Sequence, residues 1–165
     1  MPARNAPTSW LNPSHSPTEA PITAHGGASS LSNAVIEYGG SDTTAMVTVL
    51  SPEATAWFVE FRQARSHPLR ISAQAVSSFT SALAIVTGEE PQAFVDNGIQ
   101  AVAVLSQADP VLSSNSMWGD LAVPYEFDGS IIVAGPIGPR LSVTAGAELH
   151  FPANAQLIVG SASEG

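Results

Sequence analysis

The sequence predicts an α+β fold: an extended N-terminal arm, a β-hairpin, two or three helices, and then a mostly antiparallel β-sheet. Three observations lead to this prediction. Prolines recur through the first 33 residues, apolar stripes at helical spacing lie in the middle of the chain, and short β-rich runs fill its last third. We therefore expect residues 1–33 to form the arm and residues 34–165 to form a single α+β domain.

The arm carries prolines at positions 2, 7, 13, 17 and 21, which interrupt helices and central strands. Its composition is that of a flexible tail. However, Trp10, Leu11 and Ile22 give it large apolar side chains, and a purely solvating tail gains nothing from a tryptophan. The alternative is an arm that lies on a neighbouring subunit, with these three residues as candidate partner-binding anchors.

Residues 34–50 predict a β-hairpin. The run 34–38 is short and β-rich, and the run 43–50 alternates valine with threonine as a half-buried strand does. Between them, residues 39–42 form a Gly-Gly-Ser-Asp turn cluster.

Two helices are expected next. The first begins at Ser51, which can cap it, and ends before Pro68, with apolar residues at positions 54, 57, 58 and 61. The second spans residues 72–87, where apolar residues at 75, 76, 79, 82, 83 and 86 form a stripe and Gly88 stands at the C-cap. Residues 91–107 suit a third helix, which we favour. The alternative is a turn at Asn97 and Gly98 followed by a strand.

Five short β-rich runs follow, at 121–127, 130–134, 140–144, 148–151 and 156–159. Glycine and proline separate them at intervals typical of antiparallel sandwiches and barrels. Residues 141–159 also resemble a single rung of a parallel β-helix. One rung cannot bury its apolar face alone, and the sequence offers one copy, so an antiparallel hairpin is favoured.

The composition excludes several classes of function. The chain has five arginines, no lysine and no cysteine, against 14 acidic residues, for a net charge of -9. It therefore lacks disulfides, thiolate metal sites and catalytic lysines, and its charge opposes binding to nucleic acid or anionic membranes. The first 20 residues lack an apolar signal-peptide core, so cytoplasmic synthesis is expected. No cofactor or metal is predicted.

Two groups of residues remain candidates for a site. Glu126 and Asp128 project from the same face of a strand, so they are expected to lie close together, with His150 as a further polar group. We favour a purely structural interpretation, in which these residues form the solvated end of a strand before a turn. Met117 and Trp118 are the large apolar residues of a polar loop, and this makes them candidate partner-binding residues. The alternative, left open here, is that the loop folds back and buries Trp118 beneath itself.

These observations favour a non-enzymatic structural or assembly protein that packs against copies of itself or a larger particle. A chain with so few charges is expected to have part of its surface covered by other subunits. Over its whole length, the layout of a Pro/Gly/Ser/Thr-rich arm and a compact β-containing body resembles the small head-decoration or cement proteins of tailed phages. That resemblance implies an oligomer that clamps capsid subunits in a virion. The alternative is a small hydrolase or ligand-binding domain using Glu126 and Asp128.

Overall fold

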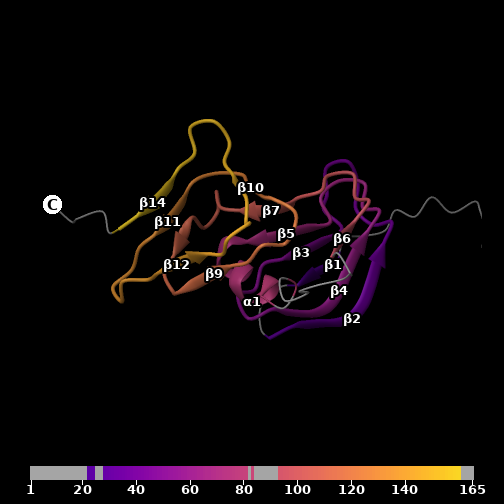
Figure 1. The fold of residues 1–165 in the computed structure, drawn as a ribbon, viewed down its shortest axis with the longest axis horizontal. Coiled ribbons are helices and arrows are strands. Elements are labelled where there is room, and N and C mark those ends of the chain that lie inside the picture. Colours follow the sequence, from indigo (N-terminus) through magenta and orange to yellow (C-terminus); the bar gives the residue numbers. More distant parts are fainter. Residues whose placement is uncertain (1–21, 25–27, 82, 84–92, 161–165) are drawn as a thin grey trace, which may run out of the picture.

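The computed structural model describes residues 22–24, 28–81, 83 and 93–160. These residues wind into a β-solenoid, in which each turn of the chain stacks its strands on those of the preceding turn (Figure 1). All the strand pairings among them are parallel. The antiparallel contact recorded there is the isolated bridge between Ser41 and Thr44.

One sheet of six strands, one strand from each turn, runs the length of the solenoid in the order β1-β3-β5-β7-β10-β13. We call it the long sheet. Its strands are β1 (Ile22–Ala24), β3 (Val47–Val49), β5 (Leu69–Ser72), β7 (Val102–Leu105), β10 (Tyr125–Phe127) and β13 (Leu149–His150).

The remaining sides of the solenoid change along its length. The first turns carry a second sheet made of β2 (Ser30–Glu37), β4 (Thr55–Arg62) and β6 (Phe94–Val95). The later turns carry two smaller sheets instead: β8 (Val111–Leu112), β11 (Ile131–Val133) and β14 (Leu157–Val159), and the pair β9 (Ser116–Trp118) and β12 (Leu141–Val143).

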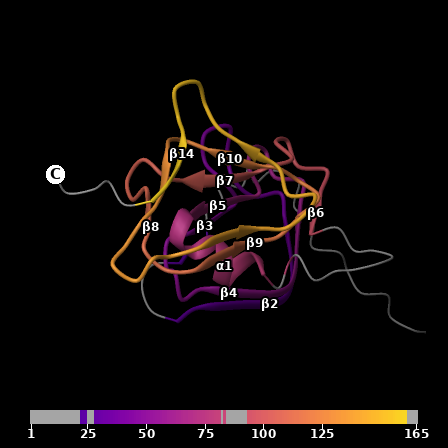
Figure 2. The same cartoon turned by 60° about the vertical axis from the view of Figure 1, so that its left-hand side comes forward.

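The change occurs after β5, where the short 3-10 helix η1 (Ala73–Ala75) leads into α1 (Val76–Thr80). Helix α1 contacts both β4 and β9, and it lies between them in Figure 2. It therefore fills the solenoid interior where one arrangement of strands gives way to the other.

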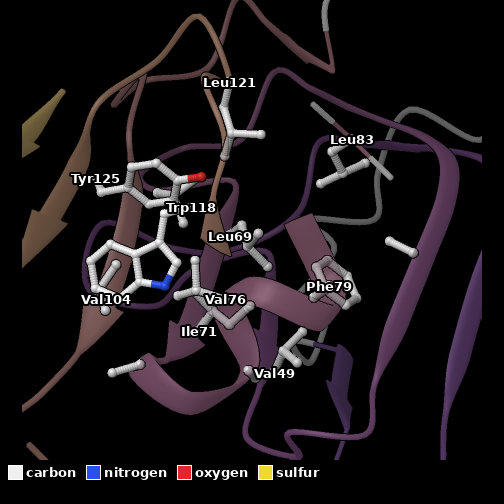
Figure 3. Packing of buried hydrophobic residues seen from close by; sticks show 14 of the residues in the cluster. Val49, Leu69, Ile71, Val76, Phe79, Leu83, Val104, Trp118, Leu121 and Tyr125 are labelled. Carbon is white, nitrogen blue, oxygen red and sulfur yellow. The ribbon is translucent and has the colours of Figure 1, made fainter. Parts of the chain in front are cut away.

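Inward-facing residues form continuous apolar columns because each strand keeps its register with the next. One column of the long sheet is Val47, Leu69, Val102 and Tyr125, each at most 3% exposed. Figure 3 shows how side chains of the long sheet, of α1 and of β9 meet in this core. Rings also stack from turn to turn: the centroids of Phe61 on β4 and Phe94 on β6 lie 5.3 Å apart. Burial of these columns is the main stabilisation of the fold.

In three successive turns, the corner that follows the β2-β4-β6 sheet has the same backbone conformation. Tyr38, Gln63 and Asp96 directly follow β2, β4 and β6, and all three have positive φ angles of 59°, 52° and 51°. Next to this corner, the buried Asn97 accepts a hydrogen bond from the Ala64 N–H (3.0 Å) and donates one to the Phe61 carbonyl (3.1 Å). Asn97 thus ties the third turn of the solenoid to the second.

The predicted α+β class is wrong, and so is the helix expected between Ser51 and Pro68. That segment contains β4. The apolar spacing that suggested a helix combines two faces of a strand, since Phe61 is buried while Trp57 and Phe58 are 53% and 64% exposed. Phe58 has a positive φ of 51°, which breaks the alternation and turns two successive aromatic side chains outward.

The hairpin predicted over 34–50 is also wrong, because β2 and β3 belong to different sheets and each pairs in parallel. The antiparallel C-terminal sheet is wrong for the same reason. Residues 141–159 form the rung that their pattern resembled, with β12, β13 and β14 each stacked in parallel on an earlier strand.

Helical structure in the predicted segment 72–87 is limited, among described residues, to η1 and α1, and residues 82 and 84–87 lie outside them. The favoured helix over 91–107 is wrong, and the alternative of a turn followed by a strand, β7, describes it. Strand β1 and the start of β2 lie inside the segment 1–33 that was assigned to the arm. None of the described helices is long and apolar enough to cross a membrane.

Candidate functional site

The C-terminal end of the solenoid leaves inward-facing apolar side chains uncovered. On β11, Ile131 and Val133 are 0% and 2% exposed, whereas their partners one turn later on β14, Leu157 and Val159, are 39% and 73% exposed. The cause is that no further turn among the described residues stacks on β14. The same columns that are buried in the preceding turn thus open to solvent in the last one.

Strand β12 shows the same pattern. Val143 stacks on Trp118, which is 0% exposed, yet Val143 itself is 42% exposed. We define the open end as the inward-facing apolar residues of β12, β13 and β14, together with Phe151, which directly follows β13: Val143, Leu149, Phe151, Leu157 and Val159. Strands β12 and β14 lie together at one end of the molecule in Figure 1.

The open end has little protection against edge pairing. An edge strand offers unpaired backbone groups, and proteins normally blunt such edges with charges or prolines. From residue 129 to residue 160, Arg140 and Glu148 are the charged side chains apart from His150. Strand β14 itself reads Leu-Ile-Val. An apolar, uncharged edge of this kind is a template for further β-pairing.

A second candidate is a groove of about 350 Å³ on the outer face of the long sheet, lined by both charged and apolar side chains. Arg70, Ala103 and Glu126 are aligned across β5, β7 and β10, and all three line the groove. Neighbouring strands lie roughly 4.8 Å apart. The small Ala103 therefore leaves a gap between the two longer side chains, and this gap forms the floor of the groove.

Glu126 and Asp128 both line this groove, as their spacing suggested, but they are held differently. Glu126 Oε2 lies 3.0 Å from His67 Nε2. Asp128 Oδ1 accepts three hydrogen bonds, from the Ser106 N–H (2.7 Å), the Ser106 hydroxyl (3.0 Å) and the Gln107 N–H (3.0 Å). Asp128 therefore fixes a corner of the solenoid, and Glu126 has the freer carboxylate.

His150 is the register partner of Glu126 on the neighbouring strand β13, but it does not line the groove, and its Nε2 lies 3.4 Å from Glu148 Oε2. The histidine beside Glu126 in the groove is His67, which directly precedes Pro68 in the segment predicted to be the first helix. His67 and Glu126 are 59 positions apart in the chain. They meet because of the register of the long sheet, which the sequence alone does not give. Among the described residues, no group of three or more histidine or acidic side chains could hold a metal ion.

The predicted partner-binding residues are placed differently from one another. Met117 is 52% exposed on β9, and Ile22 is 51% exposed on β1. Trp118 is fully buried, with its ring 5.9 Å from that of Tyr125 and 5.5 Å from that of Phe127, so it offers no surface to a partner. Trp10 and Leu11 lie outside the described residues.

Tyr125 is the described residue with the clearest change in acidity. Its hydroxyl donates a hydrogen bond to the Gly119 carbonyl (2.8 Å). Burial raises the pKa of Tyr125 to about 12, because the phenolate would lose its hydration. Tyr125 is part of the core and lines neither candidate site, so this shift concerns stability.

No protein-family model, curated protein or solved structure matches the chain. The geometry of the two candidate sites is therefore the guide to its function.

Proposed function

We propose that this chain is a non-enzymatic structural protein that packs against copies of itself or a larger particle through the open end of its solenoid. The observation that carries the proposal is the exposure of Leu157 and Val159, whose partners in the preceding turn, Ile131 and Val133, are buried. A solenoid normally needs a polar capping turn at its ends, and an apolar end without one favours association.

The open end supplies a moderate driving force. Full burial of a valine or leucine side chain is worth about 1.5–3 kcal/mol. Scaled by the exposed fractions of Val143, Leu157 and Val159, covering them contributes on the order of 2–5 kcal/mol per copy. Backbone pairing along β14 adds to this value, and the loss of translational freedom opposes it. The expected association is therefore specific and reversible.

A virion accessory subunit is one protein of this class, since the layout of the chain resembles that of head-decoration proteins. In that case the open end or the arm would contact capsid subunits. The low charge of residues 129–160 supports contact at the open end, whether the partner is another copy or a capsid subunit. Few charged groups lose their hydration when this end is covered.

Sedimentation velocity over a range of protein concentrations tests the proposal. The wild-type chain should associate, and Val159→Lys should abolish the association, because a lysine at an edge opposes pairing. Val35→Lys is the matched control: Val35 is 56% exposed on β2 in the first turns, so its substitution should leave association intact. A wild-type chain that stays monomeric at high concentration, with or without residues 1–21, would count against self-association.

The groove supports a second candidate function, a small ligand-binding or hydrolytic site. The observation in its favour is the 3.0 Å contact between His67 and Glu126 inside a hollow that also holds Arg70, which together offer proton-accepting, proton-donating and cationic groups. Turnover of p-nitrophenyl glycosides or esters, lost in Glu126→Gln at unchanged stability, would support it. Glu148→Gln is the control, since Glu148 also pairs with a histidine but lies outside this groove.

A further inference from the structure

We propose that the occupant of the open end is a second copy of this chain, related by a two-fold axis, with β14 pairing antiparallel to β14 of the other copy. The inference rests on the proposed function, because it names the partner for the same surface. It commits to one arrangement, which differs from a head-to-tail stack of solenoids and from an arm laid over the end.

The two ends of the solenoid present different sets of strands. The first turns present strands of the long sheet and of the β2-β4-β6 sheet. The last turns present β13, β14 and β12, which belong to three different sheets. The rearrangement around α1 separates these two cross-sections. Because a strand stacks well only on a strand, the end formed by β12, β13 and β14 does not match the β1-β2 end of another copy, whereas two such ends offer each other the same set of strands.

The distribution of charge along the chain also favours contact between two open ends. The chain carries a net charge of -9, yet residues 129–160 contain one arginine and one glutamate, which cancel. The excess negative charge therefore lies in the rest of the chain. Joining two open ends brings together stretches in which the charges cancel, so the contacting surfaces themselves add little repulsion.

The free edge of β14 favours the same arrangement. This strand pairs with β11 on one side, and none of the described strands pairs with its other side. In an antiparallel pairing with itself, the central residue Ile158 lies on the two-fold axis. Leu157 and Val159, whose neighbours on β11 point into the core, then continue that core across the interface. Such a contact closes after two copies and does not grow into a fibre.

Disulfide trapping tests this arrangement directly, because the chain has no cysteine of its own. Directly opposed residues of antiparallel strands have Cα atoms roughly 4.5–5.5 Å apart, within the range that a disulfide spans. The full chain with Ile158→Cys, a position that is 42% exposed, should form covalent dimers under mild oxidation. Val35→Cys, on the first turns, and Met117→Cys, on the outer face of β9, should remain monomeric on denaturing gels.

Mixed samples separate the alternatives. Covalent pairs between the Ile158→Cys and Val35→Cys chains, without Ile158→Cys homodimers, would overturn the two-fold arrangement in favour of a head-to-tail stack. Association that disappears when residues 1–21 are removed would overturn it in favour of the arm. Association by sedimentation without trapping at position 158 would refute this inference and leave the proposed function standing, whereas a wild-type monomer would refute both this inference and self-association.

Discussion

Replacing Asn97 with alanine should destabilise the solenoid strongly, because the buried side chain of Asn97 links two neighbouring turns. Asn97 is 7% exposed and lies at a corner, where the backbone turns and strand pairing is interrupted. Its side chain there supplies hydrogen bonds to the neighbouring turn. Its carbonyl oxygen is the acceptor for the N–H of Ala64, a residue that is 3% exposed. Without Asn97, this buried N–H loses its protein acceptor.

The magnitude follows from the two contacts that the substitution removes. An unpaired buried N–H costs about 1–3 kcal/mol, and the lost bond to the Phe61 carbonyl adds about 0.5–1.5 kcal/mol. We expect Asn97→Ala to lower the free energy of unfolding by roughly 2–4 kcal/mol. For a chain of this size, that corresponds to a fall in Tm of roughly 4–16 °C.

Urea unfolding followed by tryptophan fluorescence measures this change, with the slope of the transition checked for two-state behaviour. Gln100→Ala is the control. Gln100 accepts a bond from the same Asn97 amide (3.1 Å) but is exposed, so its loss should cost less than about 1 kcal/mol. Equal effects of the two substitutions, or an Asn97→Ala effect below about 1 kcal/mol, would refute the role assigned to Asn97.

Three further substitutions test the core. The raised pKa of Tyr125, about 12 against an ordinary value of about 10, means that the unfolded phenol loses its proton first as the pH rises. Stability should therefore be complete below about pH 10 and fall by about 1.4 kcal/mol per pH unit up to about pH 12, and Tyr125→Phe should remove this fall in urea titrations across that range. Gly98→Ala should lower Tm, since a Cβ there would clash with the carbonyl group of Arg65; an unchanged Tm would contradict the close packing of these turns. Trp118→Phe should change the free energy of unfolding by no more than about 1 kcal/mol, because the lost volume is offset by removing a buried N–H for which the described structure offers no acceptor. A loss of about 3 kcal/mol in the same urea assay would show that packing dominates at this position.

Local β character in the C-terminal third could be predicted from the sequence. Each of the five β-rich runs between residues 121 and 159 contains one strand, β10 to β14. Their partners could not be predicted in the same way. Parallel and antiparallel strands have similar compositions, and the partner of Tyr125 on β13 is Leu149, 24 positions away.

The repeat itself was hidden by its irregular length. Along the long sheet, Val47 pairs with Leu69 after 22 positions, and Val102 pairs with Tyr125 after 23. Between them, Leu69 pairs with Val102 only after 33 positions, because η1 and α1 are inserted there. A fixed period, which is the usual sign of a solenoid, is therefore absent.

Composition by itself determined that the chain has no cysteine or lysine chemistry, that it is acidic, and that residues 129–160 are nearly uncharged. These properties depend on residue type alone. Only the tertiary structure decided that Trp118 is buried, that His67 meets Glu126, and that Leu157 and Val159 stand uncovered at the end of a core. The physical reason is that burial in a solenoid is set by the neighbouring turn. An inward-facing valine is core when a turn stacks on it and surface when none does, and its local sequence is the same in both cases.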